Sequence, residues 1–237
     1  YCDYPPEVQQ LKNNGSLAII GGFWDPNVEL ILSVKPDLVI GYSSVPSHIE
    51  VAERLEAMGV NVLLLFPRYL NDVLNNVELI GKATGRLEEA RMLVYSMKER
   101  VNAITLKVKE LEKVRVYYEL WFAPLMSAGP GTFIDELITL ARGENIFHDS
   151  GTSWPLVKDE DVITRDPQVI ILPTTYMSDY NVTVDQIKSR EGWSMISAVK
   201  DDRIYFVQED LLVRPGPRMV DGLEALAEII HPEAFKR

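Results

Sequence analysis

The feature that most constrains this chain is a regular apolar stripe over residues 87–111. Apolar residues follow one another there at intervals of three and four, and no Gly or Pro interrupts the run. This spacing places them on one face of a helix and leaves the charged residues on the other face. At 1.5 Å per residue the helix would be roughly 40 Å long, the width of a small domain. The stripe consists of Leu87, Ala90, Val94, Met97, Val101, Ile104, Val108 and Leu111.

The same spacing suits a coiled-coil arm, as in an elongated interaction protein. On both sides of the helix, however, short apolar runs alternate with helical stretches, which favours a strut between two lobes. Strands are expected at residues 17–20, 38–41, 60–66, 114–120, 169–172 and 203–207. Helices are expected after Asp25, which would cap the first, and at residues 46–58, 69–84, 132–142, 159–165, 184–189 and 219–230.

Strands that are continuous apolar runs and alternate with helices predict mostly parallel sheets covered on both faces. The expected fold class is therefore α/β, with two α/β lobes joined by a long backbone helix. The expected division is residues 1–84 for the first lobe, 85–113 for the helix and 114–237 for the second lobe, with a ligand cleft between the lobes.

Composition and motifs exclude several classes of function. A net charge of −11 argues against nucleic-acid partners, which need clustered Lys and Arg. No apolar run is long enough to span a bilayer, and the single Cys2 cannot form an internal disulfide. The three histidines, His48, His148 and His231, lie far apart without Cys neighbours, so no metal site is expected. A metallocluster or nucleotide enzyme on paired α/β lobes remains a distant alternative.

The Gly129–Thr132 stretch before a predicted helix has two interpretations. Its backbone N–H groups could receive an anion. An ordinary tight turn with Thr132 near the helix cap is the favoured account.

A weak internal repeat relates the two halves. In the first, Phe23 precedes Glu29 by six residues, and Pro36 follows by seven. In the second, Trp154, Glu160 and Pro167 repeat these intervals. Each glutamate falls early in a predicted helix, where its charge also suits the positive end of the helix dipole.

Aromatic residues gather at the junctions of predicted elements, where clefts form at sheet edges. Rings in such places favour a large, flat, partly apolar ligand, although any single ring could simply fill the core. Near the C-terminus, Asp210 and Arg214 stand four residues apart and can pair or present a polar rim. The junction aromatics are Tyr1, Tyr4, Phe23, Trp24, Tyr42, Trp121, Phe122, Trp154 and Tyr176.

Several short motifs resemble those of substrate-binding proteins of ABC importers, of the rigid type with a single backbone helix. The resemblance covers essentially the whole chain and is closest to the vitamin B12-binding branch. The motifs are YCDYPPE at residues 1–7, NVE at 27–29 with KPDLVI at 35–40, GENIF at 143–147, WP at 154–155 with Glu160, and RPGPR at 214–218.

The resemblance implies an extracytoplasmic, non-enzymatic receptor that binds a corrinoid as cargo, without a cofactor of its own. Its ligand contacts would fall on Tyr1, Phe23, Trp24, Tyr42, Met126, Trp154, Asp210 and Arg214. Glu29 and Glu160 would dock on an ABC permease dimer. The receptor is expected to be monomeric and either free in the periplasm or lipid-anchored through a segment not present here.

Two departures from the family pattern stand out. The strand and helix that normally precede the motif at residues 1–7 are absent, so the first lobe is expected to be incomplete. Phe23, Tyr42 and Met126 replace larger or different rings, which leaves an iron-siderophore or haem as the alternative ligand. For such a ligand the basic candidates are Arg214, Arg218 and Arg68.

Overall fold

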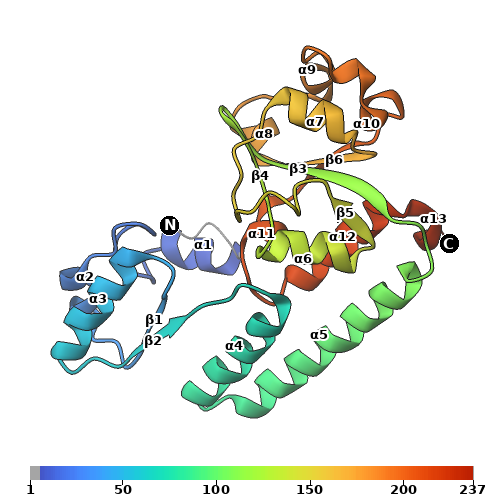
Figure 1. The fold of residues 1–237 in the computed structure, drawn as a ribbon. Coiled ribbons are helices and arrows are strands. Elements are labelled where there is room, and N and C mark those ends of the chain that lie inside the picture. The colour runs from blue at the N-terminus through green and yellow to red at the C-terminus, as the bar shows by residue number, and fades with distance from the viewer. Residues whose placement is uncertain (1–5, 237) are drawn as a thin grey trace. The chain divides into compact units, whose positions relative to one another are not determined.

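The computed structural model describes residues 6–236. Contacts divide the chain into two compact units, Tyr1–Phe66 and Pro67–Arg237, whose elements are labelled in Figure 1. Each unit combines helices with parallel strands, so the expected α/β class is confirmed. The expected three-part division at residues 84 and 113, and the cleft between lobes, stay predictions.

The first unit is built on a two-stranded parallel sheet. Strand β1 (Val39–Tyr42) pairs in register with β2 (Val62–Leu65), and helix α3 (Pro46–Ala57) connects them. Helices α1 (Pro6–Asn13) and α2 (Val28–Ser33) come before β1. The small core beneath the sheet is formed by Val28, Ile31 and Leu55 with partly buried neighbours on both strands.

Two local predictions in this unit are wrong. Residues 17–20 do not form a strand, and Ile19 is exposed, because an apolar run becomes a strand only where a neighbour takes its backbone hydrogen bonds. Asp25 does not cap α2. The cap is Asn27, whose side-chain oxygen accepts a hydrogen bond from the N–H of Leu30 at 2.8 Å.

The second unit contains a five-stranded sheet around β3 (Val114–Phe122). Strand β6 (Val169–Pro173) lies parallel to β3, and β7 (Ile204–Val207) lies parallel to β6. Strand β5 (Gly143–Asn145) runs parallel to the first residues of β3. Strand β4 (Leu125–Ser127) turns back antiparallel along its last residues. The sheet is therefore parallel except at β4.

Helices cover both faces of this sheet. Buried residues of α4 (Leu70–Ala83), α6 (Phe133–Leu140) and α12 (Met219–Ile230) share one core with Val116 and Tyr118 of β3. The opposite face packs on a second core beneath α7 (Asp159–Arg165), in which Trp193, Tyr117 and Tyr176 are the largest fully buried side chains. The remaining elements are α8 (Thr175–Ser178), α9 (Val184–Lys188), η1 (Trp193–Met195), α10 (Ser197–Lys200), α11 (Glu209–Val213) and α13 (Pro232–Phe235).

The long helix α5 (Leu87–Val108) belongs to the second unit, where it packs on α4 and α12 (Figure 1). Every residue of the predicted stripe is buried or partly buried, so the stripe is covered within the chain. The helix ends one turn earlier than expected. Leu111 N–H donates to Val108 O in a tightened turn, and Leu111 O accepts from the Arg142 side chain. Its role as a strut between lobes stays a prediction.

No helix in the described part of the chain has the length and apolar content needed to cross a membrane.

Candidate functional site

Three predicted ligand residues come together in the first unit. The Phe23 ring lies 4.9 Å from Trp24 and 6.0 Å from Tyr42, measured between centroids. Trp24 is 74% exposed and Phe23 is 42% exposed, so both rings are available to a ligand. Tyr42 is the last residue of β1, which confirms that aromatic residues gather where elements meet.

An open apolar cavity of about 380 Å³ lies beside these rings. Its wall includes Phe23 together with Ile31, Val39 and Val62, which belong to or border the small core of this unit. The first unit therefore presents a ring cluster next to uncovered apolar surface. Tyr1, the remaining aromatic predicted for this region, lies outside the described residues.

In the second unit, Met126 and Trp154 lie on segments that pair with each other. Met126 of β4 forms an antiparallel bridge with Leu156. Hydrogen bonds from Ser127 N–H to Pro155 O and from Val157 N–H to Leu125 O extend this pairing. The pairing brings the segments that carry Met126 and the 43% exposed Trp154 side by side, and their role as ligand contacts stays a prediction.

A second ring cluster adjoins Met126 and was only partly anticipated. Trp121 pairs across strands with Met126, and its ring lies 5.2 Å from Phe122 and 5.4 Å from Tyr180. Trp121 and Tyr180 are exposed. Trp121 and Phe122 were recognised at a strand end, but neither was assigned to the ligand. Tyr180 was missed because it follows the four-residue helix α8, which the sequence pattern did not reveal.

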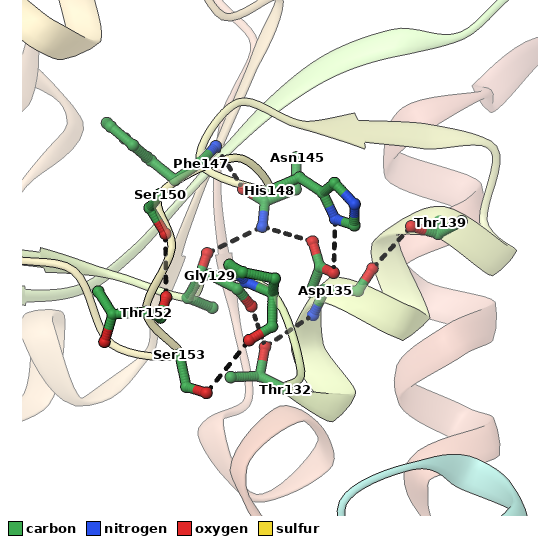
Figure 2. A network of polar contacts seen from close by, with 12 residues as sticks. Gly129, Thr132, Asp135, Thr139, Asn145, Phe147, His148, Ser150, Thr152 and Ser153 are labelled. Carbon is green, nitrogen blue, oxygen red and sulfur yellow. Dashed lines mark hydrogen bonds and ion pairs between the residues drawn. The ribbon is translucent and has the colours of Figure 1, made fainter.

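A polar network, shown in Figure 2, holds the Trp154 segment against β4. Asn145 Nδ2 donates to Ala128 O at 2.8 Å and to the buried Asp135 Oδ1 at 2.7 Å. Asp135 Oδ2 lies 2.8 Å from His148 Nδ1. Gly129 N–H donates to Ser153 O at 2.8 Å. Asn145 of the GENIF motif therefore holds Ala128 just after β4, and the next residue, Gly129, contacts the segment that carries Trp154.

The turn before α6 is a helix cap, as the favoured interpretation predicted. Thr132 Oγ1 accepts from Asp135 N–H at 3.2 Å and donates to Gly129 O at 2.9 Å. A Cβ at Gly129 would lie only 2.1 Å from Thr152 O. Glycine at this position thus permits the close approach of the turn to the Trp154 segment.

Asp210 and Arg214 pair with each other, which is one of the two arrangements expected for them. Asp210, in α11, accepts a hydrogen bond from Arg214 Nε one helical turn later. The Arg214 side chain is 48% exposed, so its remaining donors can reach a ligand.

Glu29 and Glu160 occupy equivalent positions in the two units. Each is exposed and lies in the first turn of its helix, α2 and α7 respectively. Glu29 forms a loose ion pair with Arg54 at 3.4 Å, and both partners are largely solvated. The helix placement expected from the internal repeat is confirmed, and the docking role stays a prediction.

A buried ion pair that the sequence did not reveal lies behind α7. Glu119 of β3 is completely buried, and its two oxygens accept from Arg190 at 2.5 and 2.7 Å. Burial raises the pKa of the Glu119 carboxyl above its ordinary range, while the hydrogen bonds from Arg190 act in the opposite direction. Arg190 also stacks on Trp193, whose Nε1 donates to Asp159 at 2.7 Å at the start of α7.

Among the described residues, His, Cys, Asp and Glu form no group of three or more that could hold a metal ion.

A model of the periplasmic binding protein family matches residues 2–211 of the chain. The chain belongs to the periplasmic binding protein family. It is 33% identical, over 98% of its own length and 72% of the relative's, to the ABC transporter substrate-binding lipoprotein YvrC of Bacillus subtilis strain 168.

Two solved structures share this fold. The periplasmic vitamin B12-binding protein BtuF of Vibrio cholerae is 25% identical, with a TM-score of 0.80, over 99% of this chain and 87% of that one. A possible iron-binding periplasmic solute-binding protein from Staphylococcus epidermidis is 31% identical, with a TM-score of 0.76, over 88% of this chain and 81% of that one.

The names of these relatives describe binding proteins rather than enzymes. This family member is therefore a substrate-binding protein of an ABC transporter, and it acts outside the cytoplasm.

Proposed function

We propose that this binding protein captures a corrinoid, a vitamin B12-like ligand, and delivers it to an ABC permease dimer. The observation that carries the proposal is a cluster of exposed rings in each compact unit. Phe23 and Trp24 belong to the first cluster, and Trp121 and Tyr180 to the second. Rings that expose an apolar face to solvent suit a broad, flat molecule, which stacks on them and buries that face.

The Asp210–Arg214 pair would supply the polar contacts of this site. A corrinoid carries amide side chains around its ring and a nucleotide tail. A carboxylate accepts from amide N–H groups, and a guanidinium donates to amide carbonyls or a phosphate. The corrinoid is cargo here, and no resident cofactor is required.

Titration with cyanocobalamin, followed by calorimetry and by the absorbance of the ligand, tests the proposal. We expect a one-to-one complex, and the absence of binding at high micromolar concentration would reject a corrinoid. Trp154→Ala should weaken binding by roughly ten-fold, the loss expected for one aromatic contact and its burial. Tyr95→Ala removes an exposed ring from the outer face of α5 and serves as the matched control.

An iron-siderophore or haem is the second candidate ligand. It is supported by the similarity to the possible iron-binding protein and by the basic residues Arg68, Arg214 and Arg218 in the second unit. A visible absorbance band that develops with haemin or a ferric catecholate, but not with cyanocobalamin, would favour this alternative.

Docking on the permease would use one acidic contact from each unit. Glu29→Lys and Glu160→Lys should each reduce transport while the affinity for ligand stays unchanged, because both side chains are exposed helix-start residues. Glu56→Lys, an equally exposed change on α3, is the control. Loss of ligand affinity in either docking variant would contradict the assigned role.

A further inference from the structure

His48 lies between two of the predicted ligand residues and contacts the backbone of both. Its Nδ1 is 3.0 Å from the backbone nitrogen of Tyr42, and its Nε2 is 2.6 Å from the carbonyl oxygen of Phe23. The His48 ring also packs edge-on against the Phe23 ring, with centroids 5.0 Å apart. One side chain of α3 thus joins the end of β1 to the loop that carries Phe23 and Trp24.

Strand geometry explains why the Tyr42 N–H is available to this side chain. The N–H groups of Val39, at the start of β1, and of Ser43, directly after it, donate toward β2, to Asn61 O and Leu65 O. Because alternate residues of a strand direct their N–H groups to opposite edges, the Tyr42 N–H faces away from β2. His48 accepts it there and so satisfies a donor at the other edge of the sheet.

The two contacts determine the protonation state of the ring. A backbone N–H can only donate, so Nδ1 must carry a lone pair. A carbonyl oxygen can only accept, so Nε2 must carry the proton. In the other neutral tautomer, Nδ1–H would face the Tyr42 N–H and the Nε2 lone pair would face the Phe23 oxygen. In the imidazolium, Nδ1–H would again face the Tyr42 N–H. The arrangement is therefore specific for a neutral imidazole with its proton on Nε2.

His48 packs beside Gly41. A Cβ at Gly41 would lie at ordinary contact distance from His48 Nδ1, 3.6 Å, and closer to Leu64 Cδ2, 3.1 Å. The loop contacted by His48 has its own closing contacts, a bridge between Gly21 and Pro26 and a hydrogen bond from Asn27 N–H to Ile20 O. His48 adds a link from a different element, 25 residues away in sequence from Phe23.

We propose that His48 is a positioning residue for the ligand site, which holds the Phe23 loop against the end of β1 and so orients the Phe23 and Tyr42 rings. The two hydrogen bonds are called the His48 clamp. The role in binding rests on the proposed function, because Phe23 and Tyr42 are ligand contacts only if that function holds. The clamp itself is a property of the protein without ligand.

The clamp is tested directly by ¹⁵N NMR of histidine-labelled protein. With three histidines in the chain, His48 is assigned from the signal that disappears in His48→Phe. At neutral pH we expect an unprotonated Nδ1 and a protonated Nε2. A proton on Nδ1 would overturn the clamp whether or not any ligand binds.

Its effect on binding is tested with three substitutions and cyanocobalamin as the probe. His48→Phe keeps a ring but loses both hydrogen bonds, and it should weaken binding by ~10-fold, as expected for two such bonds. His48→Asn keeps an acceptor for Tyr42 N–H, and His48→Gln offers a donor to Phe23 O, so each should recover part of the loss. Amide exchange at Tyr42 should accelerate in His48→Phe and stay slow in His48→Asn.

Glu56→Gln, a change at an exposed residue of the same helix α3, is the control and should leave the affinity within two-fold. Wild-type affinity in His48→Phe, together with unchanged exchange at Tyr42, would overturn the positioning role. If the wild-type protein binds neither cyanocobalamin nor haemin, the proposed ligands are wrong, and NMR and exchange at Tyr42 still decide for or against the clamp.

Discussion

Replacing Arg190 by methionine would leave a completely buried carboxylate without its partner. Both oxygens of Glu119 accept hydrogen bonds from the Arg190 guanidinium, and the Glu119 side chain has no exposed surface. Breaking a buried ion pair from one side costs about 3–5 kcal/mol, because the remaining charge is neither solvated nor compensated. For a protein of this size, that loss corresponds to a fall in Tm of roughly 6–20 °C.

The loss should depend on pH in a defined direction. Burial already raises the pKa of Glu119, and without Arg190 the pKa would rise further. The pKa of Glu119 is then higher in the folded state than in the unfolded state, where it is about 4.3. At any pH between these two pKa values, Glu119 is protonated in the folded protein and ionised in the unfolded chain. Stability therefore falls as pH rises through that window. The difference between Arg190→Met and wild type should be small near pH 4 and fully developed at pH 7.

Urea denaturation at pH 4 and pH 7 measures both differences. Adding Glu119→Gln to Arg190→Met removes the uncompensated charge and should restore part of the stability at pH 7. Arg91→Met breaks an exposed pair with Glu88 and, as the control, should cost less than about 1 kcal/mol. The reasoning fails if Arg190→Met costs less than about 1 kcal/mol at pH 7, or if its cost is equal at both pH values.

Two further predictions concern the second unit. Hydrogen bonds from Ser197, and to a lesser degree Arg115, lower the pKa of the Asp166 carboxyl. The ionised carboxylate therefore stabilises the folded protein above pH ~4, and this stabilisation is lost as pH falls through the folded pKa. Asp166→Asn should lower the free energy of unfolding by on the order of 1 kcal/mol at pH 7, because the site is partly exposed, and by little at pH 3. Urea denaturation at the two pH values measures this, and an equal loss at both would contradict the prediction. At the α4–α5 contact, a Cβ on Gly81 would lie 2.3 Å from the Cβ of Ala90. Gly81→Ala should therefore lower the free energy of unfolding by about 1–3 kcal/mol, and Ala90→Gly in the same chain should recover part of it in thermal melts; no recovery would show that the two residues do not collide.

Features encoded by local periodicity were predictable from the sequence. The apolar stripe of α5 was predicted correctly because its 3-4 spacing shows which residues of the helix face a core. This holds whichever elements form the rest of that core. The parallel strands β1, β2, β3, β6 and β7 were found from their continuous apolar runs, which are typical of strands buried on both faces. β1 has such a run although its Ile40 is exposed. The run at residues 17–20 looked the same, yet a strand also requires a partner, and composition does not show whether one exists.

Short and irregular elements were not predictable. Strands β4 and β5 have three residues each, too few for a period to appear. The cap of α6 was predicted at Thr132, but the cap of α2 depends on which of two neighbouring polar residues reaches an N–H. Asp25 and Asn27 were equally plausible by type, and only local backbone geometry selects Asn27.

The candidate site shows a similar division between what sequence can and cannot reveal. Ring positions such as Phe23, Tyr42 and Trp154 followed from their place at element ends and from the family resemblance. The groups that hold those rings did not. His48 is 25 residues from Phe23, so this contact leaves no pattern in a single sequence. The buried pair of Arg190 and Glu119, 71 residues apart, was missed for the same reason.

Each ring segment has its own polar support, and this bears on how ligand choice is encoded. The Phe23 loop is held by His48. The Trp154 segment is held by a hydrogen bond from Ser127 of β4 to Pro155 and by one from Gly129, in the Asn145 network, to Ser153. Aromatic side chains can stack on many flat ligands, but the angle and spacing of the rings determine which ligand they bury most completely. Two receptors with the same rings and different supporting side chains could therefore select different ligands. Substitutions at His48 and Asn145 should accordingly change the preference between cyanocobalamin and haemin more than a Phe23→Tyr exchange does.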